Sequence, residues 1–261
     1  MTKEEILALR NEPWRDELRK KMSPKDRGAL ERVKMPELTP EYRVTTFTEE
    51  VQQGLTKEMA VAEAQRCLDC ADPSCMKGCP VGINIPTFIK QIEKEDFEAA
   101  IATIKKTSSL PAVCGRVCPQ EKQCEGNCIK LKMKQKAVAI GYLERFAADY
   151  ERESGKMKAP ECAPKNGKKV CTVGSGPSAL AFAADMIKAG YEVTVFEALH
   201  EIGGVLKYGI PEFRLPNSVV DAEINTLRQM GVNFQPNTIV GKTISYEQLH
   251  EMGFDGIFVG S

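Results

Sequence analysis

Eight of the ten cysteines lie in two short runs, and they are the residues with the most specific chemistry in the sequence. Both runs contain a Cys-Pro step and small or turn-forming residues between the sulfurs. Tight turns of this kind let several thiolates converge on one point, as an iron–sulfur cluster requires. A proline after a ligand also fixes the direction of the backbone. Counted four and four, the runs match two four-iron clusters: they contain Cys67, Cys70, Cys75 and Cys79, then Cys114, Cys118, Cys124 and Cys128.

Structural zinc is the main alternative for these cysteines. Zinc usually takes two Cys-x2-Cys knuckles of similar shape, and only Cys67 and Cys70 have that spacing. Disulfides need an oxidising compartment, and the N-terminal residues do not resemble a secretory signal. The spacing therefore favours clusters and leaves a zinc-stabilised interaction module as the non-enzyme alternative. Cys162 and Cys171 lack cluster spacing and are expected to be ordinary thiols.

A second candidate site is a glycine-rich turn between an apolar strand and a helix. The sequence predicts a strand at Lys169–Val173, a helix at Pro177–Ala189 and a strand at Glu192–Phe196 that ends at Glu197. This order is the βαβ fingerprint of dinucleotide-binding domains. Because a helix N-terminus offers free N–H groups and partial positive charge, it suits a pyrophosphate.

Each residue of this fingerprint has a distinct expected role. Gly174 makes the tight turn, and Gly176 lets the backbone approach the pyrophosphate. Ala179 takes the third position, where a small residue allows close packing of helix on strand. Glu197, 23 residues after Gly174, is placed to accept hydrogen bonds from ribose hydroxyls.

Helices are expected to position the two cysteine runs. Thr56–Cys67 is predicted to be a helix capped by Thr56, which delivers the first run at its C-terminal end. Two helices between the runs carry apolar stripes, the first with Phe88, Ile89 and Ile92, the second starting at Phe97. Shorter helices are expected in the charged N-terminal arm at Lys3–Arg10 and Pro13–Lys21, where Trp14 anchors the arm on its own domain or on a partner.

A further helix is predicted after the second run, over Lys136–Glu151. Its apolar residues recur every three or four positions, and Glu144 lies at the edge of that face. From residue type alone, Glu144 is a solvated charge.

The C-terminal part of the sequence continues the α/β pattern. Ile202–Pro211 reads as a loop that lets the backbone approach a flat or bulky group. Ser218–Met230 and Ser245–Met252 read as helices. Strands are expected at residues 232–234 and 238–240, between these helices, and at residues 254–259, after the second helix.

Composition bounds the class of protein. The chain has 261 residues with 36 basic and 36 acidic side chains, and this balance argues against a nucleic-acid-binding protein. No apolar run approaches the ~18 residues of a membrane span. We expect a cytoplasmic protein with a helical domain at 1–155 holding two [4Fe-4S] sites, a linker at 156–167, and a Rossmann-like dinucleotide-binding domain at 168–261.

Together these motifs resemble the small (beta) chain of NADPH-dependent glutamate synthase. The resemblance is carried by Cys67–Pro80, Ala112–Pro119, Gly174–Leu180, and Gly203-Gly204 followed by Tyr208–Pro216. The wider group includes the large subunit of NADH-dependent ferredoxin:NADP oxidoreductase and the N-terminal part of dihydropyrimidine dehydrogenase. The resemblance implies an all-α, helical ferredoxin-like domain, then an α/β FAD-binding domain that is incomplete at its C-terminus.

The resemblance also implies an interleaved set of cluster ligands. One cluster takes Cys67, Cys70, Cys75 and Cys128. The other takes Cys79, Cys118, Cys124 and, as an oxygen donor, Glu144. This assignment reverses the solvated interpretation of Glu144 and leaves Cys114 a structural role.

The resemblance implies that FAD is bound by the glycine fingerprint and by residues of the loop that follows the second strand. The implied cofactor-binding residues are Gly174, Gly176, Pro177, Ser178, Ala179, Glu197, Gly204, Leu206, Gly209 and Val240. NADPH would bind only in a longer protein, because a second glycine fingerprint is absent from this sequence. The chain is therefore expected to be a fragment that lacks the NADPH-binding domain and is inactive with NADPH alone.

The implied function is electron transfer between NADPH, FAD and two [4Fe-4S] clusters in glutamate synthesis, with no catalytic side chain assigned. The implied partner is the glutamate synthase large chain or a ferredoxin-type electron acceptor, with no nucleic acid and no membrane; a homo-oligomer is compatible with the sequence. The alternative enzyme is a bifurcating ferredoxin:NADP oxidoreductase subunit.

Overall fold

The computed structural model describes residues 2–155 and 157–261, and these form two compact units. The first unit comprises Met1–Pro40 and Val51–Lys156, and the second comprises Glu41–Glu50 and Met157–Ser261. The division after 156 falls at the start of the expected linker. The grouping of 41–50 with the second unit has no signal in the sequence.

The first unit is built from helices with clear local start signals. Thr2 forms a capping box with Glu5, Pro13 opens the second helix, and the Thr56 side chain accepts from Met59 N. These elements agree with the expected arm helices and the expected cap. The helices are α1 (Lys3–Arg10), α2 (Pro13–Lys21), α3 (Pro24–Ala29), α5 (Lys57–Gln65), α6 (Ser74–Lys77), α7 (Ile85–Glu93), α8 (Phe97–Lys105), α9 (Pro111–Val117), α10 (Ile129–Lys132) and α11 (Ile140–Glu153), with 3-10 turns at Gln120–Lys122 and Glu125–Asn127; α4 (Pro40–Arg43) lies where the two units divide.

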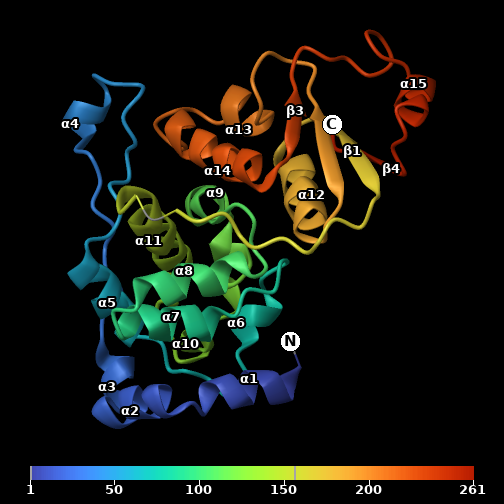
Figure 1. Cartoon of the computed structure of the whole chain (residues 1–261). Helices are drawn as coiled ribbons and strands as arrows, with labels where there is room; N and C mark the ends of the chain where they lie inside the picture. Colours follow the sequence, from blue (N-terminus) through green and yellow to red (C-terminus); the bar gives the residue numbers. More distant parts are fainter. Residues whose placement is uncertain (1, 156) are drawn as a thin grey trace. The chain divides into compact units, whose positions relative to one another are not determined.

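The core of this unit lies between α7, α8 and α11, which lie against one another (Figure 1). Ile89, Ile104 and Leu143 are almost fully buried there. Phe97 meets Phe146 edge-on, with ring centroids 5.1 Å apart. The apolar stripes seen in the sequence therefore form this core, as the helical periodicity predicts.

The last helix begins later than the sequence predicts, at Ile140 instead of Lys136. The Arg66 guanidinium donates to the carbonyl oxygens of Lys136 and Ala137 at 2.7 and 2.9 Å. Ala139 N donates to Glu63 Oε1 at 2.8 Å. Because these backbone groups bond to side chains far away in sequence, they cannot form the first helical turn.

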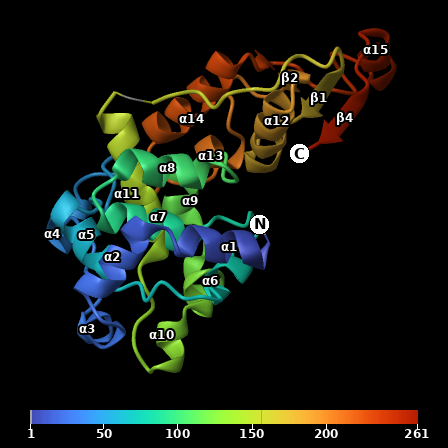
Figure 2. The same cartoon turned by 60° about the horizontal axis from the view of Figure 1, so that its bottom comes forward.

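The second unit contains a parallel four-stranded sheet in the order β3-β2-β1-β4. Its strands are β1 (Lys169–Val173), β2 (Glu192–Phe196), β3 (Asn233–Gln235) and β4 (Gly256–Val259). Helix α12 (Pro177–Lys188) joins β1 to β2 and packs on both (Figure 2). It ends at Lys188 with Ala189 as its C-cap, and Gly190 follows with φ +88°. The predicted βαβ unit is thus present at the predicted residues.

The rest of this unit differs in detail from the sequence-based expectation. The expected loop at Ile202–Pro211 contains a short helix, α13 (Val205–Tyr208), which packs on α14 (Asn217–Met230). Residues 238–240 form no strand: Val240 makes only an isolated bridge with Ile244. Helix α15 (Tyr246–Glu251) is capped by Ser245, and its Leu249 packs with Phe254 in a cluster with Cys171 and Phe196. Across the described ranges, no helix has the length and hydropathy to cross a membrane.

Candidate functional site

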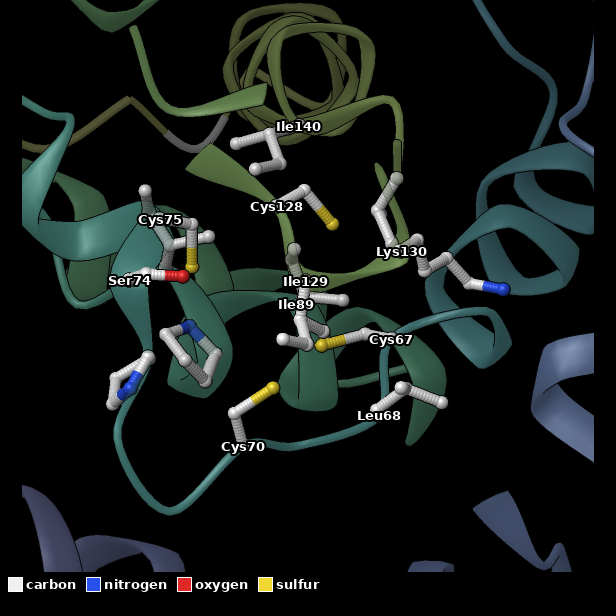
Figure 3. Close-up of a pocket in the computed structure, with 14 residues that line it drawn as sticks. Cys67, Leu68, Cys70, Ser74, Cys75, Ile89, Cys128, Ile129, Lys130 and Ile140 are labelled. Atoms are coloured by element: carbon white, nitrogen blue, oxygen red, sulfur yellow. The ribbon is translucent and has the colours of Figure 1, made fainter. Parts of the chain in front are cut away.

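The first candidate site is a small cavity of about 30 Å³, partly open to solvent, in the first unit. Cys67, Cys70, Cys75 and Cys128 all line it, and their sulfur atoms are directed toward a common space (Figure 3). These are the four cysteines that the resemblance groups together. The remaining wall is mainly apolar and consists of Leu68, Pro73, Ser74, Ile85, Pro86, Ile89, Ile129, Lys130, Val138 and Ile140.

Helix ends bring these four sulfurs together. Helix α5 ends at Gln65, so Cys67 follows in an irregular loop instead of ending the helix as expected. Cys75 lies in the short helix α6, which Gly78 closes. Cys128 is the N-cap of α10. The two runs therefore meet because Cys128 folds back onto the first run, as the interleaved ligand set requires.

Burial strongly affects the thiols of this cavity. It raises the pKa of Cys70 to about 11, with a further increase from the neighbouring Cys67 and Cys128. Burial likewise raises the pKa of Cys67 and Cys75. These effects follow from the closeness of the four sulfurs around the cavity. Such thiols hold their protons at neutral pH unless a cation replaces them.

Two buried lysines lie beside the same cavity. Lys90 Nζ donates to the Cys67 carbonyl oxygen at 2.7 Å and pairs with Glu93. Its positive charge opposes the effect of burial on the pKa of Cys67. Lys130 lines the cavity, and burial lowers its pKa. Positive charge of this kind stabilises a negatively charged group bound by four thiolates.

The second predicted ligand set gathers beside α11. Burial raises the pKa of Cys118 to about 11, followed by the effects of Glu144 and Cys79. Burial raises the pKa of Cys124 to about 12, and Glu125, Glu144 and Cys79 add to it. Cys79, Cys118, Cys124 and Glu144 are therefore electrostatic neighbours, although they come from four different segments.

Glu144 is buried, with 5% of its surface exposed. The interpretation of this residue as a solvated charge is wrong, because α11 turns it toward the protein interior beside the thiols. Cys114 lies half-buried within α9, and its carbonyl accepts from the Gln120 side chain at 3.1 Å. Its structural role stays a prediction.

The four sulfurs of the first donor set line a cavity. Throughout the described ranges, no three His, Cys, Asp or Glu side chains converge closely enough for one metal ion. Zinc would need its sulfur ligands at about 2.3 Å from one centre. In the first site the sulfurs instead surround an apolar space (Figure 3). Cys162 is exposed and Cys171 is buried in β1, outside both ligand sets.

The dinucleotide candidate is an open cavity of about 1030 Å³ at the carboxyl end of β1 and β2. Parallel sheets bind ligands at this edge. Seven of the ten predicted cofactor residues line it, and the sequence reasoning missed others, including Ser175, Thr238 and Gly260. The seven are Gly174, Gly176, Pro177, Ser178, Glu197, Gly204 and Val240.

The backbone geometry of this site requires glycine at two positions, one in the turn after β1 and one before α13. Gly174 has φ +95°, and a Cβ there would lie 2.9 Å from the Gly260 carbonyl oxygen. Gly204 has φ +52°, and a Cβ there would lie 2.9 Å from Gly176 Cα. The second glycine segment therefore rests directly on the first, which explains why both line one cavity.

Glu197 is buried and already bonded to the turn. It accepts from Ser175 N at 2.8 Å and from Leu199 N at 2.9 Å, and the Ser175 hydroxyl also donates to it. The carboxylate thus orients the glycine turn in addition to its predicted role toward a ribose. The sequence feature that could have identified Ser175 is its hydroxyl group, which lies between the two glycines of the turn.

Three predicted residues lie outside the residues that line the cavity. Ala179 is fully buried, and its Cβ lies 3.0 Å from where a Cβ on Gly260 would be. This position agrees with close packing of helix on strand. Leu206 is buried in α13, and Gly209 follows that helix. Their contact with a flavin stays a prediction.

Two family models match the chain. One, described as dihydropyrimidine dehydrogenase domain II, 4Fe-4S cluster, matches residues 43–156. The other, described as an NAD(P)-binding Rossmann-like domain, matches residues 172–238. The first range contains both cysteine sets, and the second contains the glycine turn and Glu197.

Several curated proteins are similar to the chain. The NAD-dependent dihydropyrimidine dehydrogenase subunit PreT of Escherichia coli K12 is 39% identical over 203 residues, which are 78% of this chain and 49% of the relative. The glutamate synthase (NADPH) small chain of Escherichia coli K12 is 38% identical over 232 residues, 88% of this chain and 48% of the relative. That of Azospirillum brasilense is 35% identical over 216 residues, 83% of this chain and 45% of the relative.

The chain spans about half the length of these relatives. Their names and the two matched domains confirm the resemblance drawn from the sequence. The chain is a relative of the glutamate synthase (NADPH) small chains, with a 4Fe-4S domain followed by an NAD(P)-binding Rossmann-like domain.

Proposed function

We propose that the chain is the iron–sulfur and flavin-binding part of an electron-transfer oxidoreductase that supplies a glutamate synthase large chain. The observation that carries this proposal is the convergence of four cysteine sulfurs on one largely apolar cavity. This cavity lies within the matched 4Fe-4S domain. When bound, the clusters and the flavin would supply one- and two-electron chemistry that protein side chains cannot perform.

In this proposal the chain binds two [4Fe-4S] clusters. Cys67, Cys70, Cys75 and Cys128 hold the first. Cys79, Cys118, Cys124 and Glu144 hold the second. A carboxylate is a harder ligand than a thiolate, so the two sites would differ in their affinity for electrons.

The cavity beside the glycine turn binds the FAD in this proposal. The N-terminus of α12 faces the pyrophosphate, and Glu197 accepts from the ribose while it holds the Ser175 turn in place. Val240 and Gly204 are among the residues that line this cavity.

A second candidate function has its own support. PreT, a subunit of an NAD-dependent dihydropyrimidine dehydrogenase, is as similar to this chain as the glutamate synthase small chains are. The same cluster and flavin sites would then deliver electrons to a pyrimidine-reducing partner. A bifurcating ferredoxin:NADP oxidoreductase remains an alternative on the sequence resemblance alone.

Anaerobic purification tests the core of the proposal. We expect a brown protein with iron and sulfide in amounts that match two four-iron clusters, and with bound or rebinding FAD. A colourless protein with stoichiometric zinc would contradict it. The purified protein, mixed with each candidate partner, then distinguishes the functions by the product formed: glutamate, or a reduced pyrimidine.

A further inference from the structure

One residue between two predicted cluster ligands is held by the N-terminal arm. Asp69 lies in the loop between Cys67 and Cys70 and is fully buried. Its backbone has φ +53°, in the left-handed region that non-glycine residues rarely adopt. A buried carboxylate in such a conformation needs partners that fix it in place.

Those partners are three arginines of the arm. Arg15 donates to one oxygen of the Asp69 carboxylate. Arg19 Nη1 donates to the other, Oδ2, at 2.6 Å. Arg10 Nε donates to the Asp69 carbonyl oxygen at 2.8 Å. The arginines lie more than 45 residues before the loop, on α1 and α2.

The arm is itself fixed to the helix behind the cavity. Arg15 Nη1 donates to Thr87 Oγ1 on α7 at 2.8 Å, and Arg19 Nη1 donates to the Arg10 carbonyl oxygen at 2.7 Å. Lys90, also on α7, donates to the Cys67 carbonyl oxygen. The Cys67–Cys70 loop is therefore held by arginines of the arm and by a buried lysine of α7.

We propose that the N-terminal arm is part of the first cluster site, in which Arg10, Arg15 and Arg19 act through Asp69 as positioning residues for the Cys67–Cys70 ligand loop. This inference rests on the proposed cluster function. It adds residues that precede the matched 4Fe-4S domain, which begins at residue 43.

The physical basis is the cost of breaking a buried ion pair. If one partner is removed, the other charge stays buried without compensation, which is strongly destabilising. The local response is an opened loop, which exposes two of the four ligands to water and chelators. The second ligand set lies outside the Cys67–Cys70 loop, so we expect it to be retained when Asp69 is changed.

The test compares cluster loss in the full chain with Asp69→Asn. Asparagine keeps the shape and tolerates positive φ, but removes the charge that faces the two guanidinium groups. With a chelator present under anaerobic conditions, iron release from the unaltered chain should show two phases. Cys70→Ser identifies the phase of the first site, because it removes a ligand of that site only.

We expect Asp69→Asn to accelerate the first-site phase at least about tenfold, because a broken buried pair exceeds the free energy of one tenfold step. The second-site phase should not change. The EPR signal of the first cluster should shift while that of the second stays the same, which a general loss of stability would not produce.

A milder variant keeps the test informative if Asp69→Asn does not retain its first cluster. Arg19→Gln removes one of the two side-chain pairs and leaves Arg15 in place, so a smaller acceleration of the same phase is expected. Lys20→Gln is the matched control, because Lys20 is the next residue on α2, is 75% exposed and pairs with Asp16 instead of Asp69.

Equal acceleration of both phases, or no acceleration, would overturn the inference while leaving the cluster function intact. The absence of any iron–sulfur cluster in the unaltered chain would overturn the proposed function and this inference with it.

Discussion

At the scale of single residues, the buried Glu144 separates the two candidate cluster sites chemically. Its charge raises the pKa of both Cys118 and Cys124, after the larger effect of burial. A buried carboxylate beside thiols is unfavourable unless a cation compensates the negative charge. In the proposed second site, iron would provide that compensation.

We therefore predict that Glu144→Ala loses or converts one cluster and keeps the other. The remaining three thiols cannot complete a four-iron site without a fourth donor. EPR spectra together with iron analysis measure the effect, and about half of the iron should be lost if the second site fails to assemble.

The matched control is Cys114→Ser, which should keep both clusters. Loss of one cluster in that variant would restore the simpler scheme in which each cysteine run binds its own cluster. Two unchanged four-iron signals in Glu144→Ala would rule out the ligand assignment.

Lys90 is predicted to set the potential of the first site. Its ammonium group is buried and holds the Cys67 carbonyl at 2.7 Å. Positive charge near a cluster favours the reduced, more negative form, so Lys90→Met should lower the potential. An interaction of about 1 kcal/mol corresponds to roughly 40 mV for one electron. Glu93 keeps its two bonds from Arg27, at 2.7 and 2.9 Å, so it is not left unpaired.

A redox titration followed by EPR measures this shift. Lys94→Met places the same substitution four residues later, on an exposed side chain that lies over the Trp14 ring. It should leave the potential unchanged. An equal shift in both variants would mean that the effect is not specific to Lys90.

At the scale of elements, the turn from β1 to α12 shows that its two glycines have different functions. Gly174 needs its left-handed backbone and has the Gly260 oxygen where a side chain would be. Gly176 has ordinary extended backbone, and a Cβ there would meet nothing nearer than 3.8 Å. The first glycine is therefore required by the fold, and the second is free to serve the ligand.

We predict that Gly176→Ala preserves the folded second unit but weakens FAD binding by about tenfold or more, because the added methyl group occupies the approach to the pyrophosphate. Flavin titration measures the affinity, and circular dichroism checks the fold. Gly174→Ala should instead lower the stability of the unit itself. Unchanged flavin affinity in Gly176→Ala would place the cofactor elsewhere.

Local signals made most elements predictable from the sequence. The caps at Thr2, Thr56 and Ser245, the left-handed Gly190 and the strand–turn–helix order all act within a few residues. Features fixed by distant groups were not predictable in this way. The late start of α11 depends on Arg66, some 70 residues earlier, and residue type alone misassigned Glu144 as solvated.

The same distinction applies to the candidate sites. The spacing of the cysteines indicated clusters, and the four sulfurs of the first cavity come together as the resemblance implied. The arginines around Asp69 had no sequence signal, because Arg15 and Asp69 are 54 residues apart and arginine in a charged arm normally faces solvent. Ser175 was not predicted, because its hydrogen bond to Glu197 forms only when β1 pairs with β2.

At the scale of the whole molecule, the chain assigns its two kinds of cofactor site to separate units. Both cysteine sets lie in the first unit, and the glycine turn lies in the second. The only tryptophan, Trp14, is on α2 beside the arginines that hold Asp69. Its fluorescence therefore reports on the unit that holds the clusters.

Removal of the clusters should consequently destabilise the unit that Trp14 reports. Without them, the first unit contains an open apolar cavity and several thiols whose pKa is raised by burial. Because metal binding contributes directly to folding, its loss should lower the midpoint of thermal unfolding by more than about 5 °C, equivalent to a few kcal/mol in a unit of this size.

This prediction can be tested by Trp14 fluorescence on samples with and without clusters, under reducing and anaerobic conditions. Cys162→Ser is the control, because the exposed Cys162 lies outside both ligand sets and is the thiol most open to side reactions. It should show the same decrease as the unaltered chain. An equal midpoint with and without clusters would mean that the helical unit folds independently of them, and that its ligand loops are held by protein contacts such as the Asp69 ion pairs alone.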